Sequence, residues 1–443
     1  MINRNSPEYE KETVILAQID LTTGSIPKTL LRFAFPMICG NLLQQLYNVA
    51  DTLIVGRFLG SDALGAVGSS YTLMTFLTSI LLGLCMGSGA LFSVCWGQRD
   101  LARLRRQTHA AFVLIAVCTV VLNAAAFLLL DAMKTLLSVP AEVWPLMRSY
   151  LFVIFLGIGG TFLYNYYASL LRAVGNSLVP LLFLAAAAVL NIALDLVFVL
   201  VCRWGVEGAA AATVLAQWLS GIGTAVYTLV RCPELRITGA MLRELLSASV
   251  LTCLQQSVMN LGILMVQGRI NSFGPVIMAA FAAAVKIDSF AYMPLQDFGN
   301  AFSTFIAQNY GAQQPERIRR GIRTAVILSS VFAVCVSACV VLLAAPLLGL
   351  FLQPGEREIL QAGVTYLPVD HNGHVSLDAL REAICDDTIL VSVMYVNNEI
   401  GAVEPIEEIA KIIKEKKPSA YFHVDAIQAY GKYVIRPKKQ GID

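Results

Sequence analysis

The stretch NVADTLIVGR at residues 48–57 decides the fold, because a related stretch, NLGILMVQGR, recurs at residues 260–269 with a shift of 212. Both stretches begin with Asn and end with Gly-Arg. A second set of matches follows at a shift of 214: Trp96-Gly97 with Tyr310-Gly311, and RLRR at 103–106 with RIRR at 317–320. This period is too long for a solenoid and is typical of membrane proteins built from two duplicated halves.

The composition agrees with a membrane protein. Of the 443 residues, 57% are hydrophobic and 14% are charged, and the mean hydropathy is +0.67. These values are ordinary for a polytopic membrane protein and extreme for a soluble one. The net charge of +2 is too small to indicate a nucleic-acid partner. The ten cysteines show no CxxC and no metal-ligand spacing, so we expect buried thiols and no metal site.

Nine apolar runs are long enough to cross the hydrocarbon core of a bilayer, which needs about 20 helical residues. We therefore predict nine transmembrane helices and a lipid bilayer as the main partner. The predicted spans are 29–55, 63–95, 107–130, 146–171, 177–201, 205–230, 243–268, 275–308 and 321–346.

The distribution of Lys and Arg predicts the orientation. With the N-terminus in the cytoplasm, sixteen of these residues fall on the inner side and five on the outer side. The polar tail at 1–26 lacks the short apolar run of a cleavable signal peptide. We therefore expect a multi-pass protein of the cell membrane with a cytoplasmic N-terminus. An odd number of spans would place the segment that follows them outside.

The repeat divides the membrane part into lobes. An even number of helices for each copy keeps both copies in one orientation, so the first lobe has six helices, at 27–231. The second lobe, at 243–350, has only three. Charged residues then rise from 38 of the first 350 to 21 of the last 83. We therefore predict a mainly α membrane protein, a join at 351–367, and a partial soluble α/β segment at 368–443.

Four motifs, in order, resemble a known transporter family. They are the stretch from Pro36 to Gly60, LRAVGN at 171–176, NIALD at 191–195 and AQNYGA at 307–312. On the basis of these motifs, residues 27–360 resemble multidrug and toxic compound extrusion (MATE) transporters. The resemblance implies twelve helices in two lobes and export of cationic, amphipathic small molecules in exchange for H⁺ or Na⁺. Helices ten to twelve have no counterpart here.

Two acids in the first repeat are candidates for ion binding. A carboxylate at membrane depth costs several kcal/mol unless it is paired, hydrated or neutralised. Asp51 and Asp195 lie in predicted spans and can carry a proton or ligate Na⁺. Asn191 lies four residues before Asp195, on the same helix face, and can add an amide oxygen. The resemblance gives these three residues an ion-binding role. The alternative for Asp51 is plain hydration near the outer end of its span.

Other polar side chains in the spans are candidates for lining a cavity. For each of them, helix–helix hydrogen bonding is an equally good interpretation. Lys286 lies within the eighth span, where nothing in the sequence explains it. The seventh span has Gln255 and Gln256 where some family members have an acid, so we expect no second-lobe ion site. The candidates are Gln44, Tyr47, Asn48, Asn165 and Lys286.

The tail alternates predicted strands and helices, which indicates a parallel α/β arrangement. Strands are expected at 364–370, 388–395 and 421–425, and helices at 376–384 and 405–416. The motifs NNEIG at 397–401 and HVDAIQAYGK at 423–432 resemble cysteine desulfurases, which are pyridoxal-phosphate (PLP) enzymes. The resemblance implies that Asp425 pairs with the pyridinium nitrogen, Gln428 bonds the ring hydroxyl and Asn397 helps to hold the cofactor.

We nevertheless expect no enzymatic activity, no catalytic residue and no bound cofactor. By the resemblance, the Schiff-base lysine would follow Asp443, and the phosphate-binding segment would precede Gly363, where membrane sequence stands. No cysteine matches the mobile catalytic one. The sequence thus predicts a MATE-type antiporter, impaired by loss of three helices. The alternative is a PLP-dependent desulfurase, which we judge inactive. We hypothesise that the chain is a chimera joined between Gly355 and Leu367.

Overall fold

The computed structural model describes residues 18–136, 139, 143–232, 243–271, 275–351, 367–386, 388, 390–397 and 400–443. The chain divides into two compact units, Met1–Phe351 and Leu352–Asp443. Each unit is described by itself below.

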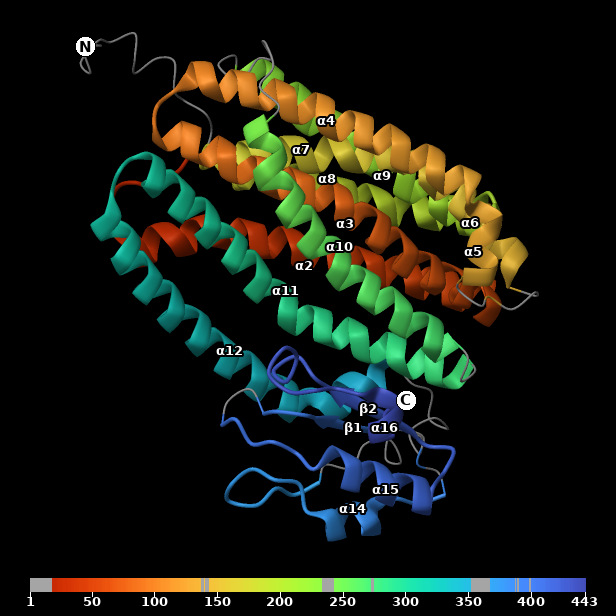
Figure 1. The fold of residues 1–443 in the computed structure, drawn as a ribbon. Coiled ribbons are helices and arrows are strands. Elements are labelled where there is room, and N and C mark those ends of the chain that lie inside the picture. Colours follow the sequence, from red (N-terminus) through yellow and green to blue (C-terminus); the bar gives the residue numbers. More distant parts are fainter. Residues whose placement is uncertain are drawn as a thin grey trace. The chain divides into compact units, whose positions relative to one another are not determined.

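The described residues of the first unit form helices and the connections between them. Over the described residues, nine long helical rods coincide with the nine apolar runs of the sequence (Figure 1). Two rods are composite, since a 3₁₀ turn joins α6 to α7 and a π-helical segment, η2, extends α8. The bounds are α2 Ile26–Leu59, α3 Ser61–Gly97, α4 Leu101–Leu128, α6 Trp144–Ile154, η1 Phe155–Gly157, α7 Ile158–Ala173, α8 Leu178–Asp195, η2 Leu196–Val201, α9 Gly205–Arg231, α10 Arg243–Asn271, α11 Pro275–Gly311 and α12 Pro315–Phe351, with a short α5 at Leu130–Leu136.

Five of these rods are long and apolar enough to cross a membrane, judged over the described residues by length and composition alone. They carry many exposed Leu and Val side chains, as expected where lipid replaces water. The number of membrane crossings stays a prediction. The five are 65–97, 101–128, 144–173, 178–201 and 205–231.

The helix bounds repeat with the shifts found in the sequence. Leu59 and Asn271, which end α2 and α10, are 212 apart, and Gly97 and Gly311, which end α3 and α11, are 214 apart. The two extra residues therefore fall in the connection between α10 and α11. The helices that follow, α4 and α12, also begin 214 residues apart. Helices α10 to α12 thus repeat α2 to α4.

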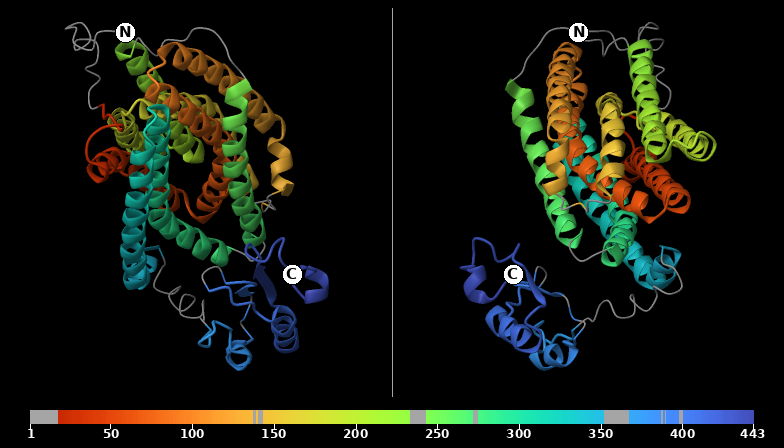
Figure 2. Two further views of the ribbon diagram at one scale, coloured as in Figure 1. Left: turned by 60° about the vertical axis from the view of Figure 1, so that its left-hand side comes forward. Right: turned by 90° about the vertical axis from the view of Figure 1, so that its right-hand side faces the viewer.

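The repeated helices pack reciprocally. Helix α2 contacts α11, and its counterpart α10 contacts α3, as expected for two lobes related by a pseudo-two-fold axis (Figure 2). At one end of this interface, Gly97 and Gly311 face each other's helix. A Cβ on Gly97 would overlap the carbonyl oxygen of Gln308, and one on Gly311 would overlap that of Val94. Both positions therefore need glycine, because the opposing atoms are backbone.

The second unit contains a two-stranded parallel sheet, β1 (Leu390–Met394) beside β2 (Tyr421–Asp425), as predicted. The crossover helix α15 (Ile406–Lys416) buries Ile409 and Ile413, and Phe422 is fully buried in the same core. Helix α14 (Leu377–Ala383) begins after Ser376, whose hydroxyl accepts from the amide of Ala379. A four-residue helix, α16 (Pro437–Gln440), lies near the C-terminus.

The strand predicted at 364–370 is wrong over its described part. Residues 367–370 make only an isolated bridge, between Val369 and Val375. The reason lies in the turn that follows, where the Asp370 carboxylate accepts hydrogen bonds from the amides of Asn372 and His374. An Asx-type turn of this kind folds the chain back after one residue pair. The start of the predicted strand, 364–366, lies outside the described residues.

Candidate functional site

The strongest candidate site lies inside the first lobe, where α8 ends. Asp195 is fully buried and Asn191 is 1% exposed, so the two side chains share an inner face of α8, as their spacing predicted. Neither oxygen of the Asp195 carboxyl has a hydrogen-bond partner in the protein, and the same holds for the amide oxygen of Asn191. Buried polar oxygens almost always have partners. Three oxygens without partners on one helix face are therefore available to a small cation, a proton or water.

The backbone at this point is irregular. Asp195 is the last α-helical residue before the π-helical segment η2, and such segments occur often at functional sites. The wider turn changes the direction of the residues that follow. On the neighbouring helix α9, the Thr213 hydroxyl accepts a hydrogen bond of 3.2 Å from the Asn191 amide nitrogen. This contact orients the Asn191 side chain and adds a hydroxyl oxygen to the site.

Helices α2 and α6 complete the site. Asp51 of α2 is only 8% exposed and lies within electrostatic range of Asp195. The buried Tyr150 of α6 lies within the same range of both carboxyls. Carboxyl, amide and hydroxyl oxygens are the ligands that hard cations prefer, and paired carboxyls can also exchange protons. The residues present therefore fit either H⁺ or Na⁺.

The predicted cavity residues divide into two groups. Gln44, Tyr47 and Asn48 lie on the same face of α2 as Asp51, and Tyr47 is within electrostatic range of that acid. Asn165 of α7 donates a hydrogen bond of 2.9 Å to the Thr161 carbonyl of its own helix, which supports a structural role.

One predicted site residue and one buried acid that was not predicted belong to α11. Lys286 belongs to this helix, but its side chain lies outside the described residues. Sequence reasoning missed Asp297 of the same helix, an acid that is only 3% exposed. Both of its oxygens accept from the Asn41 amide nitrogen at 2.6 Å, which joins α2 to α11 across the lobe interface. The Arg172 guanidinium also lies within electrostatic range.

The sequence repeat relates the Asn41–Asp297 pair to a second contact between the lobes. At the two shifts, Asn41 corresponds to Cys253 and Asp297 to Gly83. Gly83 and Cys253 also touch, since a Cβ on Gly83 would lie 2.6 Å from the Cys253 Cα. The same position of the fold is therefore occupied by a close backbone contact in one half and by a carboxylate–amide pair in the other.

In the second unit, the residues implied by the desulfurase resemblance gather at one edge of the sheet. Asp425 ends β2, and Asn397 follows β1, which ends at Met394 in register with Asp425. Ligands of parallel α/β proteins bind at this carboxyl edge. One carboxylate oxygen of Asp425 accepts a hydrogen bond from the Ile427 amide. The side-chain oxygen of Asn397 accepts one from the Ile400 amide, so both side chains also stabilise their own loops. The half-buried Gln428 follows in the Asp425 loop. The arrangement fits the ring-nitrogen side of PLP.

Two family profiles match the chain. The MatE profile matches residues 36–197 and 248–370, which is more than half of the sequence. The chain belongs to the MatE family. A class-V aminotransferase profile matches residues 357–443, so the two matches on this MatE protein overlap only at 357–370. The predicted join lies largely within that overlap, outside the described residues.

Curated relatives agree with both matches. The MatE chain is 32% identical over 308 residues to the probable multidrug resistance protein YpnP of Bacillus subtilis, covering 68% of each chain. It is 26% identical over 346 residues to YoeA of the same organism, a probable multidrug resistance protein, covering 75% of each. Its tail is 58% identical over 80 residues to the putative cysteine desulfurase IscS 1 of B. subtilis, and spans 21% of that protein.

Solved structures show the same fold. An outward-facing multidrug resistance MATE transporter superposes with a TM-score of 0.70 at 23% identity, covering 78% of this chain and 79% of that one. A transporter of the same superfamily from Pyrococcus furiosus gives 0.71 at 24% identity with the same coverage. The membrane unit is therefore a MATE-type fold, and the protein is a multi-pass membrane protein.

Proposed function

We propose that the chain is a secondary transporter in which binding of H⁺ or Na⁺ by Asp51, Asn191 and Asp195 drives export of cationic, amphipathic compounds. The observation that carries the proposal is the fully buried Asp195, whose two oxygens have no hydrogen-bond partner in the protein. A buried carboxyl of this kind needs a proton or a cation. Membership of the MatE family supports the transport role.

The coupling follows from differential binding. An ion can drive a conformational change only if it binds one state more tightly than the other. Asp51 on α2 and Asp195 on α8 belong to different helices, so neutralising their mutual repulsion changes how closely those helices pack. The π-helical turn after Asp195 can absorb such a change without breaking the whole helix.

We also propose that transport is impaired. Three helices of the second half are followed by aminotransferase-like sequence, in place of a second set of six. An exporter with an incomplete second lobe lacks part of the surface that encloses its substrate. The proposal extends to the origin of the chain, a chimera joined near 357–370. Sequencing one continuous DNA molecule across codons 350–370 tests it, and an intact join in the source genome would refute an artefact.

Dye accumulation in cells tests the transport proposal. Cells that express the chain should retain less of a cationic dye than cells that express Asp51→Asn. Asn165→Ala is a matched control, because it also removes a polar side chain from a first-lobe helix. No efflux by the wild-type chain would refute transport by this protein, and equal efflux by wild type and Asp51→Asn would refute the ion site.

For the second unit we propose that no desulfurase reaction takes place. The membrane helices stand where the resemblance places the phosphate-binding segment. When bound, PLP supplies an electron sink to its enzymes; here Asp425, Asn397 and Gln428 would hold only one side of its ring. Incubation of the purified chain with PLP should give no internal-aldimine absorbance, and a stable band would contradict the proposal.

A further inference from the structure

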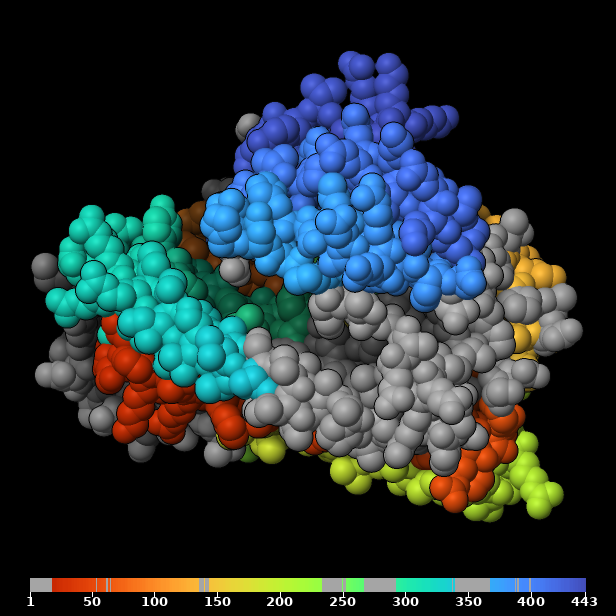
Figure 3. Space-filling model, turned by 90° about the horizontal axis from the view of Figure 1, so that it is seen from below, coloured from red at the N-terminus to blue at the C-terminus, as the bar shows by residue number. Residues whose placement is uncertain are grey.

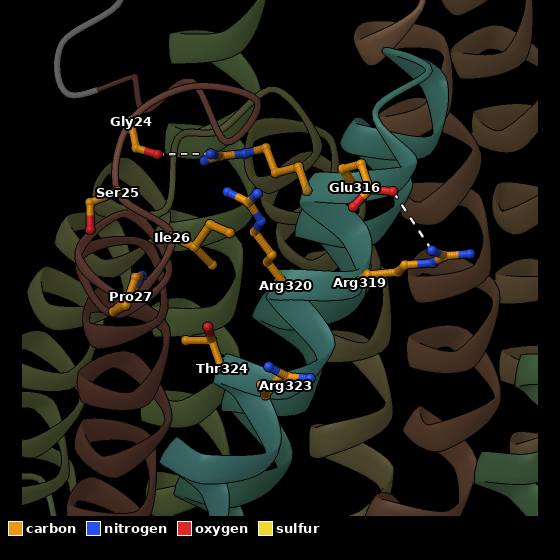
Figure 4. Close-up of a pocket in the computed structure, with 10 residues that line it drawn as sticks. Gly24, Ser25, Ile26, Pro27, Glu316, Arg319, Arg320, Arg323 and Thr324 are labelled. Atoms are coloured by element: carbon orange, nitrogen blue, oxygen red, sulfur yellow. Dashed lines mark hydrogen bonds and ion pairs between the residues drawn. The ribbon is translucent and has the colours of Figure 1, made fainter.

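We propose that a pocket between the N-terminal ends of α2 and α12 binds the headgroup of an anionic phospholipid. The pocket has a volume of about 650 Å³. Its lining comes from the segment Gly24–Pro27 on one side and from the first turns of α12 on the other (Figure 4). Four arginines line the pocket: Arg317, Arg319, Arg320 and Arg323.

The wall of the pocket is built by Arg317. Its guanidinium donates hydrogen bonds to the carbonyls of Leu21, Thr23 and Gly24, the shortest being 2.6 Å, and stacks 5.5 Å from the Phe305 ring. This one side chain holds the entry to α2 against α12. Its charge is largely engaged by these carbonyl groups, so it shapes the site and is not the main group that attracts an anion.

The electrostatics of the pocket favour an anion. Helices α2 and α12 both begin here, at Ile26 and Pro315, and a helix N-terminus carries a partial positive charge. Arginine in the first turns of a helix adds to that charge, whereas the usual preference there is for acids. Glu316 is the acid that lines the pocket, and it pairs with Arg319 at 3.7 Å.

Two arginines are available to a ligand. Over the described residues, Arg320 and Arg323 form no ion pair with an acid. Figure 4 shows Arg320 extending from α12 toward the loop at Gly24, whereas the Arg319 side chain extends to the other side, where it pairs with Glu316. The Lys and Arg bias that orients a membrane protein requires only charges near a span. It does not account for an open pocket that four arginines line at two helix N-termini.

The apolar surface beside the pocket favours a lipid over a free phosphate ion. On α2, Leu31 and Phe35 follow Pro27 at intervals of four and are 48% and 68% exposed. On α12, Val326 and Ile327 follow Arg323 by three and four residues and are 58% and 57% exposed. Side chains at these intervals share one face of a helix. Helices α2 and α12 lie side by side in the space-filling view (red and cyan, Figure 3), so an acyl chain can follow its headgroup along them.

Thermal unfolding of the purified full chain in detergent tests the site. Added short-chain phosphatidylglycerol should raise the melting temperature, because a ligand that binds only the folded state stabilises it. Phosphatidylcholine with the same chains and inorganic phosphate are the two comparison probes, and neither should reproduce the shift. The Arg320→Gln/Arg323→Gln variant should need at least about tenfold more phosphatidylglycerol, the effect of losing charge-assisted hydrogen bonds.

Arg148→Gln is the control, since it removes one exposed arginine that pairs with Asp131 at 2.9 Å and does not line the pocket. It should bind within about twofold of wild type, as exposed ion pairs contribute little. Equal binding by the double variant and wild type would overturn the proposal. So would an equal shift with phosphatidylcholine. Saturation by inorganic phosphate alone would identify a free-anion site and overturn the lipid assignment.

Discussion

The interior of the first lobe and the interface between the lobes each bury a carboxylate, but the two carboxylates differ in their hydrogen-bond partners. Asp195 in the first lobe has no hydrogen-bond partner in the protein for either oxygen, whereas Asp297 at the interface accepts from Asn41 with both. Burial by itself therefore does not identify an ion site. An acid whose oxygens are satisfied by the protein fixes one arrangement of helices, and an acid left without partners can bind an ion.

The largest loss of stability should come from Asn41→Ala. The change leaves the Asp297 carboxylate buried without the amide that now bonds both oxygens, which costs about 3 kcal/mol. Thermal unfolding of the purified chain measures it. The double variant Asn41→Ala/Asp297→Ala should recover part of the loss, because no buried charge remains. Strictly additive losses would contradict the pairing.

Gly97→Ala should have the next largest effect, a loss of about 2 kcal/mol. Its new Cβ would overlap the backbone carbonyl of Gln308, so α3 and α11 would have to separate. Gly262→Ala is the control, because a Cβ there meets no atom within 4 Å. That change should stabilise helix α10 by about 0.5–1 kcal/mol. Equal effects at the two glycines would show that the interface is not tightly packed.

Asp195→Asn should cause no loss of stability, and a gain of up to about 2 kcal/mol. Asparagine removes a buried ionisable group without removing any protein hydrogen bond of the Asp195 carboxyl oxygens. The difference in stability between Asp195→Asn and Asn41→Ala directly compares the first-lobe interior with the interface between the lobes. A loss as large as that of Asn41→Ala would place Asp195 among the structural acids.

The smallest effect concerns Asp370, an exposed carboxylate with protein partners. The hydrogen bond from the His374 amide, helped by that from Asn372, lowers the pKa of its carboxyl. A lowered folded-state pKa contributes stability that is present above the unfolded pKa and is lost as the pH falls through the folded one. Asp370→Asn should therefore reduce the acid sensitivity of the second unit alone. An unchanged acid transition would contradict this.

Much of the fold was predictable because its patterns are strong. The apolar runs predicted the nine long helical rods of the first unit but not the short α5, and the parallel strands were expected at 388–395 and 421–425. The strand at 364–370 was mispredicted in its described part because β-type residues there precede a turn that Asp370 closes with its side chain. Helix periodicity placed Asn191 beside Asp195 on one face. Helix periodicity could not predict the structural role of Asp297, because that role depends on a hydrogen bond from Asn41, which lies 256 residues away in the sequence.

The response of the purified chain to ions tests the central claim most directly, since it does not require a complete transport cycle. Melting temperature would be measured against Na⁺ at constant ionic strength, and separately against pH. Ion binding at Asp195 predicts a Na⁺ response, or a component of the pH response, that is present in the wild type and in Asn41→Ala. Asp195→Asn should lack this response and keep only the pH dependence of other groups, such as Asp370. A wild-type response retained in Asp195→Asn would contradict the assignment of the ion site.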